Sequence, residues 1–394
     1  MGGAAAPVDL CVVGAGVMGT WTALEAAERG LSVVLVDQFG PGDPRATSGD
    51  ESRITRASHG LDRVYPLWSR EALARWVELG DETGSPIFEP CGVAWFSRQE
   101  RGFVADSEAT LRALRIPVEH LAPAEAAARW PVQTDDLSFV LHEPEAGALR
   151  ARQGVRAAAA AFERRGGGLR RGRVRPGRLA TGRLHDVVAD DGTRLAAGAF
   201  VFAAGPWLAR LFPELLGDLV SVTRQDVLYL GAEPAGPPFD ATTMPAWVDD
   251  DQAFYGIPAI DGRGFKVAPD SYGPPTDPDH LDRVIDPRSI ELTRAFVARR
   301  FPRLAHAPVV ETRVCQYETT PDTHWVIDRH PDVENLWLVG GGSGHAFKHG
   351  PRIGRYVVER ILGTETDSDL AARFSLARPR ELGRGMRSGL PVTR

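Results

Sequence analysis

The stretch VDLCVVGAGVMG, residues 8–19, decides the fold of this 394-residue chain. Leu10 to Val13 predict a short buried strand, and a glycine turn follows it directly. The next residues, TWTALEAAERG, predict a helix that stops at Gly30. The apolar run LSVVLVD then predicts a second strand that ends at Asp37. The order strand, glycine turn, helix, strand predicts a parallel βαβ unit.

The glycine turn has the spacing of a dinucleotide site. Its glycines are Gly14, Gly16 and Gly19, and Asp37 follows the third glycine by 18 residues. Glycines allow the backbone to approach a pyrophosphate at a helix N-terminus, where free N–H groups favour anions. An acid at the end of the second strand accepts hydrogen bonds from the ribose hydroxyls. A lone G-x-G-x-x-G is weak evidence, but this βαβ context makes it strong.

The composition limits the other classes of function. The net charge is −6 and the pI is about 6.0, which gives no electrostatic reason to expect a nucleic-acid partner. The three cysteines are far apart and have no metal-binding spacing, so we expect no metal, no disulfide framework and a reducing compartment. The start MGGAAAPVDL lacks the features of a signal peptide, and no apolar run is long enough to span a membrane. We therefore expect a cytoplasmic protein.

A second glycine turn lies near the C-terminus, where NLWLVGGGSGHAF predicts a strand that runs into a turn. If both turns hold one ligand, the cofactor domain is discontinuous and the residues between form a second domain over the cofactor. That arrangement suits FAD better than NAD, because a flavin is long and stays bound. We expect an α/β (α+β) chain with a Rossmann-like FAD-binding domain at residues 1–84, 145–220 and 310–394. The substrate domain is then residues 85–144 and 221–309.

Lysine is rare in this chain. Of 46 basic residues only Lys266 and Lys348 are lysine, which leaves 44 arginines (46 − 2). Coding bias can explain the excess of arginine, and then the two lysines stand by chance. Alternatively, each lysine occupies a position where a planar guanidinium cannot replace a compact ammonium whose pKa shifts readily on burial.

Six motifs together resemble the monomeric sarcosine oxidase family, which includes N-methyltryptophan oxidase, pipecolate oxidase and the nikkomycin-pathway imino acid oxidase. The motifs are VVGAGVMG (12–19), SRITR (52–56), FYGIP (254–258), GFK (264–266), CQYETTPDTHWVIDRHP (315–331) and GSGHAFK (342–348). The resemblance covers nearly the whole chain. It implies a monomeric FAD-dependent oxidase whose smaller substrate domain is built on an antiparallel sheet. It also implies oxidation of the C–N bond of a secondary, cyclic or N-methyl amino acid to an imine, with dioxygen as the oxidant and hydrogen peroxide as a product.

The resemblance assigns cofactor contacts by position. Cys315 matches the cysteine that bonds to the flavin 8α-methyl group, so covalent FAD is expected. Further contacts are expected from Ala204 and Gly205 and from the turn that contains Gly342, Gly344 and His345. The stretch GPRIGRYVVERILG, residues 350–363, predicts a last helix. The backbone of that turn and the N-terminus of this helix would face the flavin pyrimidine edge.

The resemblance also assigns the reacting groups. Lys266 matches the lysine over the flavin near N5, where an ammonium stabilises the charge that develops when dioxygen becomes superoxide. Arg56 and Lys348 match the cations that hold the substrate carboxylate. The remaining matches are an arginine near the flavin ring and two aromatic residues of the substrate cavity: Arg53, Tyr255 and Tyr317.

Two departures from the family pattern argue against sarcosine as the substrate. The loop TSGDESR lacks the histidine that the family often carries before its arginine pair, and Asp270 replaces the family histidine four residues after Lys266. Asp270 either selects a cationic or hydroxylated substrate side chain, or faces away because Pro269 redirects the loop. Two further functions stay open on this scaffold: a dehydrogenase that passes electrons to a carrier, and a flavin-binding protein without turnover.

Overall fold

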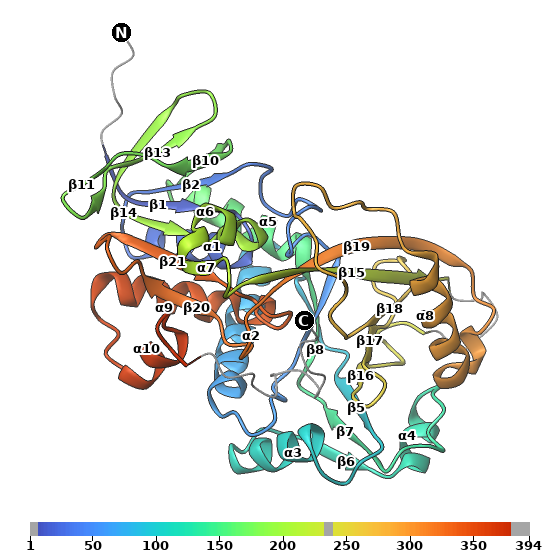
Figure 1. The fold of residues 1–394 in the computed structure, drawn as a ribbon. Coiled ribbons are helices and arrows are strands. Elements are labelled where there is room, and N and C mark those ends of the chain that lie inside the picture. Colours follow the sequence, from blue (N-terminus) through green and yellow to red (C-terminus); the bar gives the residue numbers. More distant parts are fainter. Residues whose placement is uncertain (1–6, 232–238, 380–394) are drawn as a thin grey trace.

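Two eight-stranded sheets lie side by side in the computed structural model, which describes residues 7–231 and 239–379 (Figure 1). The first sheet has the order β10-β13-β14-β1-β2-β9, with β21 beside β14 and β20 beside β21. The pairs β1–β14, β1–β2, β2–β9 and β14–β21 are parallel, and the outer pairs are antiparallel. The strands of this sheet are β1 (Val8–Val13), β2 (Val33–Asp37), β9 (Gly168–Arg171), β10 (Val174–Pro176), β13 (Asp186–Ala189), β14 (Arg194–Phe202), β20 (Val326–Arg329) and β21 (Leu336–Gly340).

Both faces of the first sheet are covered, which explains the continuous apolar runs of its central strands. Along β1, Leu10 and Val12 pack against one layer, whereas Cys11 and Val13 pack against the other. Helices form the first layer: α1 (Val17–Glu28), α2 (Val64–Thr83), α5 (Ala151–Arg164), α9 (Gly350–Leu362) and α10 (Ser368–Phe374). The second layer holds η1 (Gly205–Trp207), α6 (Leu208–Leu211) and α7 (Pro213–Leu216).

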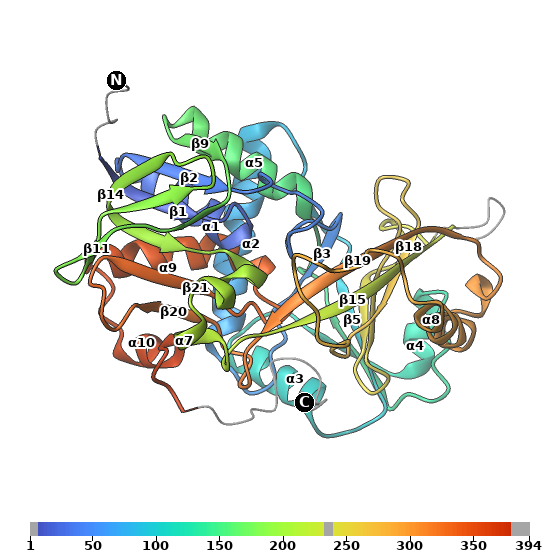
Figure 2. The same cartoon turned by 45° about the horizontal axis from the view of Figure 1, so that its top comes forward.

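The second sheet has the order β19-β15-β18-β17-β16-β5-β7-β6 (Figure 1), and Figure 2 shows β19, β15, β18 and β5 of this sheet from another side. It is antiparallel except for the parallel pair β5–β16. Phe296 and Val297 of α8 pack on one face, and Val104 of α3 packs on the other. Its strands and nearby helices are β5 (Val93–Ser97), α3 (Phe103–Ala113), β6 (Glu119–Leu121), α4 (Pro123–Arg129), β7 (Phe139–Glu143), β15 (Ser221–Leu230), β16 (Ala246–Asp249), β17 (Phe254–Ile257), β18 (Phe265–Pro269), α8 (Pro287–Arg300), η2 (Pro302–Leu304) and β19 (Val309–Thr319).

A small sheet lies between the two large sheets, and two long strands extend from the second one toward the first. The small sheet has the order β3-β8-β4, with β3 (Ser52–Thr55), β8 (Gly147–Arg150) and β4 (Phe88–Glu89). The other short elements are β11 (Leu179–Ala180), β12 (Arg183–Leu184) and η3 (Phe347–His349). The long strands β15 and β19 reach from the second sheet toward the first (Figure 1). Of these two strands, β19 carries Cys315 and Tyr317.

The mixed α/β fold class and its principal elements are confirmed. The helix expected after the first glycine turn begins at Val17, and β13 and β14 form an antiparallel hairpin around Asp191 and Gly192. The prediction that the helix at 350–363 is the last helix was wrong, because α10 follows it and packs Leu370 and Phe374 into the core. None of the helices within the described ranges combines the length and apolarity needed to cross a membrane.

Candidate active site

The first glycine turn has the close packing that its glycines predict. Gly14 has a φ of +106°, and a Cβ there would lie 2.3 Å from the Ala203 carbonyl oxygen on the neighbouring strand. A Cβ on Gly19 would lie 1.9 Å from the Gly14 carbonyl oxygen. Only glycine fits such approaches, so these two residues bring β1, α1 and β14 together. Gly16 precedes α1 at its N-terminus, where free N–H groups favour an anion.

Asp37 organises this turn from the end of β2. One carboxylate oxygen accepts a hydrogen bond from the Ala15 N–H at 2.8 Å, and the other accepts from the N–H groups of Phe39 and Gly40 at 2.7 and 2.6 Å. A carboxylate has about four acceptor positions, so Asp37 can also accept from a ligand hydroxyl.

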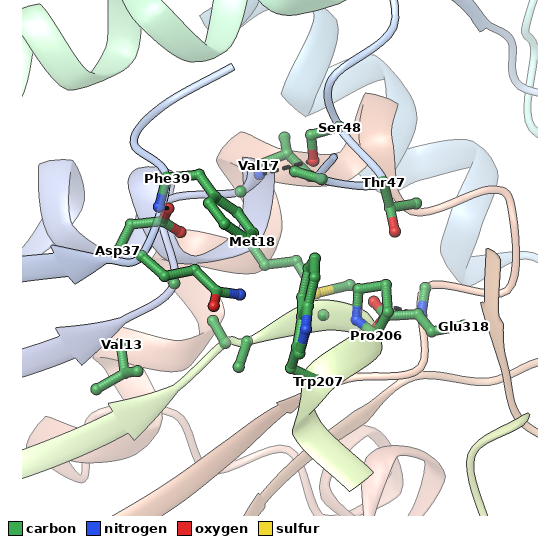
Figure 3. A pocket seen from close by; sticks show the side chains of 18 of the residues that line it. Val13, Val17, Met18, Asp37, Phe39, Thr47, Ser48, Pro206, Trp207 and Glu318 are labelled. Atoms are coloured by element: carbon green, nitrogen blue, oxygen red, sulfur yellow. Dashed lines mark hydrogen bonds between the residues drawn. The ribbon is translucent and has the colours of Figure 1, made fainter. Parts of the chain in front are cut away.

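A large cavity of about 1300 Å³, including the solvent at its mouth, begins at this turn (Figure 3). It extends from the ends of β1 and β2 past the turn at Ala204–Trp207 to the turn at Gly342–Gly344. Glycines on opposite walls leave room for a long ligand. Of the residues predicted to bind the cofactor or the reacting ring, those that line this cavity are Gly14, Gly16, Asp37, Arg53, Ala204, Gly205, Tyr317, Gly342 and Gly344.

This cavity fits FAD by its chemistry. It offers a helix N-terminus for a pyrophosphate and the Asp37 carboxylate for hydroxyl groups. Phe39 and Trp207 stand at its wall, with ring centroids 5.6 Å apart (Figure 3). Glu318 lies farther along and is buried; one carboxyl oxygen accepts from the Gly342 N–H at 3.4 Å. Burial raises the pKa of Glu318 to about 7.

A second cavity adjoins the first and shares four wall residues with it: Arg53, Tyr317, Gly344 and Phe347. All four residues predicted to bind substrate line this second cavity, namely Arg56, Tyr255, Asp270 and Lys348. His345 and Trp95 also lie in its wall. The structure therefore brings together, beside the proposed ring site, two cations, an acid and several aromatic side chains.

The two cations are positioned by buried contacts. The Arg56 guanidinium donates to the Ser58 carbonyl and lies over the Trp95 ring, 4.8 Å from the centroid. The Lys348 ammonium donates to the His345 carbonyl at 2.9 Å. Glu143 fixes the loop after Arg56, since its carboxylate accepts from the Ala57 N–H, the Ser58 hydroxyl and the Trp95 indole N–H.

Three buried histidines lie beside these cations. His59, His345 and His349 bring ring nitrogens within 4.8 Å of one another. Burial, together with the charges of Lys348 and Arg56, lowers the pKa of His59 and of His349 well below the usual value, so both imidazoles are neutral. The same positive charges oppose a metal cation at this cluster. We assign no metal here, and the metal-free site expected from the sequence stays a prediction.

Lys266 lies behind Arg53 and is part of the wall of neither cavity. Its ammonium pairs with Asp50 Oδ2 at 2.5 Å and donates to the Ser52 carbonyl at 2.9 Å. Asp50 also accepts from Arg53 Nη1 at 2.7 Å and from the Tyr229 hydroxyl at 3.0 Å. Lys266, Asp50 and Arg53 thus form one buried charged group, and Arg53 presents it to both cavities.

Cys315 is buried on β19, with its sulfur 3.5 Å from Arg53 Nη2. A guanidinium beside a sulfur stabilises negative charge on it. Burial raises the pKa of Cys11 to about 12 and that of Cys91 to about 11, so these two remain thiols. Among the three cysteines, Cys315 has the surroundings that suit bond formation.

The acidic end of the second cavity holds Asp270, whose N–H donates to the Ala253 carbonyl at 2.6 Å. Asp270 directly follows Pro269 and lies in the wall of the cavity. Asp250 lies nearby; burial and the neighbouring acids Asp251 and Asp270 raise its pKa to about 7. Tyr255, across the cavity, keeps its proton because burial raises its pKa well above the usual value.

The sequence prediction missed several residues that shape the site: Asp50, Glu143, Trp95, Glu318 and Phe347. No local pattern marks Glu143 or Trp95, which reach the site from the second sheet. Asp50 carried a signal, since an acid in a glycine- and serine-rich loop three residues before Arg53 can pair with a buried cation. Gly19 and Lys266, in turn, act from behind the cavity walls.

Comparison with known proteins agrees with this geometry. The profile of a family described as "FAD dependent oxidoreductase" matches residues 9–360. The chain is 29% identical over 385 residues to a monomeric sarcosine oxidase from Bacillus sp. (strain B-0618), covering 94% of this chain and 96% of that protein. It is 27% identical over 374 residues to an N-methyl-L-tryptophan oxidase from Yersinia pestis (strain Pestoides F), covering 94% and 99%. A crystal structure of L-proline dehydrogenase from P. horikoshii shares the fold, with a TM-score of 0.83 at 18% identity over 94% of this chain and 97% of that one.

Proposed function

The chain belongs to the FAD dependent oxidoreductase family, and on that premise we propose that it oxidises an N-substituted or cyclic amino acid with dioxygen. The observation that supports the proposal is the second cavity, whose wall contains the cations Arg56 and Lys348 and shares Arg53 and Tyr317 with the cofactor cavity. FAD, when bound, supplies the acceptor for two electrons from the substrate C–H bond and their donor to dioxygen. The products are an imine and hydrogen peroxide.

The residues of the second cavity bind different parts of the substrate. Arg56 and Lys348 hold the substrate carboxylate through charge-assisted hydrogen bonds of roughly 1.5–3 kcal/mol each. Holding the carboxylate fixes the carbon that reacts, which is a positioning effect. Tyr255, Tyr317 and Trp95 exclude water around the amine. Asp270 lies in the same wall and favours a cationic or hydroxylated group on the substrate.

We further propose that Lys266 serves the step with dioxygen and that Cys315 is the covalent anchor of the cofactor. A fixed ammonium stabilises the negative charge that develops as dioxygen accepts an electron. Arg53, 3.5 Å from the Cys315 sulfur, stabilises charge there during bond formation. Support for Cys315 as the anchor also comes from the thiol character of Cys11 and Cys91.

The proposed domains follow the two sheets except at β19, which pairs with β15 in the second sheet although residues 310–319 are assigned to the cofactor domain. The cofactor domain comprises residues 1–84, 145–220 and 310–394, and the substrate domain comprises residues 85–144 and 221–309. We propose that the protein works as a monomer in the cytoplasm, where three free cysteines stay reduced.

An anaerobic spectrum tests the function. N-methyl, cyclic and primary amino acids are added in turn to the yellow protein without oxygen. An oxidase bleaches with its substrate and regains its colour when air enters. Slow recovery in air would indicate a dehydrogenase instead, and no bleaching with any candidate would indicate a flavin-binding protein without turnover. Precipitation in acid tests the anchor, because flavin bound through Cys315 stays with the pellet.

A further inference from the structure

Asp50 is a buried carboxylate beside the active site that accepts four hydrogen bonds. Its side chain is 3% exposed, and that of Lys266 is 1% exposed. One oxygen accepts from Lys266 and Arg53, and the other accepts from the Tyr229 hydroxyl and from the Glu51 N–H at 2.8 Å. These donors come from three strands and from the loop itself.

We propose that Asp50 is a positioning residue that holds Lys266 as a buried ammonium ion beside the ring site. This inference rests on the proposed role of Lys266 toward dioxygen and explains how that lysine keeps its charge. The charged and titratable groups that face Lys266 are Asp50 from its loop, Arg53 from β3, Tyr229 from β15, Tyr255 from β17 and Cys315 from β19.

The charges around Lys266 make Asp50 decisive. Burial lowers the pKa of Lys266, Arg53 lowers it further, and Asp50 is the principal group that raises it. The two cations hold the pKa of Asp50 well below its usual range despite burial. Without Asp50, two buried cations would face each other. A buried lysine without an anion releases its proton several pH units below an exposed one.

The contacts also aim the ammonium. Lysine has three N–H donors, and the hydrogen bonds to Asp50 and to the Ser52 carbonyl use two of them. Within the described part of the chain, one donor then remains for a bound molecule. Lys266 lines a polar pocket together with Glu51, Tyr229 and Arg263. This pocket gives the Lys266 ammonium a path for proton exchange with solvent.

The scarcity of lysine makes the proposal directly measurable. Holoenzyme labelled with [ε-¹³C]lysine has only two labelled side chains, Lys266 and Lys348, and the variant Lys348→Arg assigns them. The ¹³Cε shift of Lys266 is followed against pH in the wild type and in Asp50→Asn. Glu51→Gln is the matched control, because it removes one negative charge from the residue next to Asp50. The Glu51 carboxylate pairs with Arg313 and Arg152.

We expect the midpoint for Lys266 to fall by roughly one to three pH units in Asp50→Asn and to stay within a few tenths of a unit in Glu51→Gln. Equal midpoints in the wild type and in Asp50→Asn would overturn the proposal. If Asp50→Asn does not fold, the wild type alone decides: a neutral amine at Lys266 at pH 7 overturns the proposal, and an ammonium supports it.

A kinetic arm separates this inference from the proposed function. The rate of flavin reoxidation by dioxygen is measured against pH in the same proteins. If the midpoint of that rate moves with the NMR midpoint, Lys266 serves dioxygen in its ammonium form. If the NMR midpoint moves and reoxidation does not respond, the control of Lys266 by Asp50 stands and the proposed role of Lys266 toward dioxygen is wrong.

Discussion

The two lysines of this chain lie in opposite electrostatic surroundings. Lys266 sits in a closed group with the Asp50 carboxylate and Arg53, so its charge is largely balanced within the fold. Lys348 lies in the wall of the second cavity with a second cation, Arg56, and with Asp270, and the buried imidazoles of His59 and His349 are neutral. A balanced ammonium keeps its proton and its place through a reaction. Two cations in the wall of an open cavity, in contrast, can attract an anion from solution, which is what a carboxylate site requires.

The largest effect is expected from removing the balanced lysine. Lys266→Met should slow flavin reoxidation by dioxygen roughly 100–1000-fold, as loss of one preorganised donor does elsewhere, and change flavin reduction by substrate far less. Stopped-flow absorbance measures both half-reactions separately. Lys266→Arg is the matched control, because it keeps the charge and changes only its shape. Equal slowing of both half-reactions in Lys266→Met would remove the distinction between the two lysines.

The opposite pattern is expected at the second lysine. Lys348→Met should lower kcat/KM for amino acid substrates roughly 10–100-fold, the value of one charge-assisted hydrogen bond, and leave reoxidation unchanged. Steady-state kinetics with a substrate and with its methyl ester check the reason, since the ester has no carboxylate to lose. If Lys348→Met weakened the ester as much as the acid, Lys348 would not be part of a carboxylate site.

These two regions also show how far the sequence could predict the site. The βαβ unit, the cofactor turns and the set Arg56, Tyr255 and Lys348 were predictable, because short motifs with fixed spacing carried them. The balance of charge at Lys266 was not predictable, because Asp50 lies 216 residues away in the chain and meets Lys266 only through the fold. The departure from the family pattern at Asp270 identified the position. It did not predict which way the Asp270 side chain faces, because that depends on where β18 ends.

A third prediction concerns the buried carboxyl group of Glu318. It is compared with Asp50, whose carboxylate pairs with two cations. Burial raises the pKa of Glu318 from 4.5 to about 7, so the folded state binds its proton more tightly than the unfolded state does. The contribution of Glu318 to stability is therefore complete below about pH 4.5 and is lost as the pH rises to about 7. Glu318→Gln should remove this loss.

Urea unfolding of the wild type and of Glu318→Gln at pH 5 and pH 8 measures the effect. The free energy of unfolding of the variant, relative to that of the wild type, should be higher at pH 8 than at pH 5 by roughly 2–3 kcal/mol. Other groups titrate in the same range, including His324 with its lowered pKa, but they cancel in the difference between the two proteins. A difference that does not change with pH would show that Glu318 is ionised in the fold.

The smallest effect is expected at the acidic end of the substrate cavity. Asp270→Asn should raise KM severalfold, equivalent to about 1 kcal/mol, for substrates with a cationic or hydroxylated side chain, and leave substrates with apolar side chains unchanged. The effect is modest because Asp250 lies beside Asp270, and its pKa of about 7 allows it to take up part of the negative charge. Asp251→Asn is the control, since its carboxylate accepts from Arg98 and Gln99 rather than lining the cavity. If KM stayed unchanged in Asp270→Asn for every active substrate, Arg56 and Lys348 would be the principal electrostatic contacts with the substrate. Selectivity among side chains would then come from the shape of the aromatic wall.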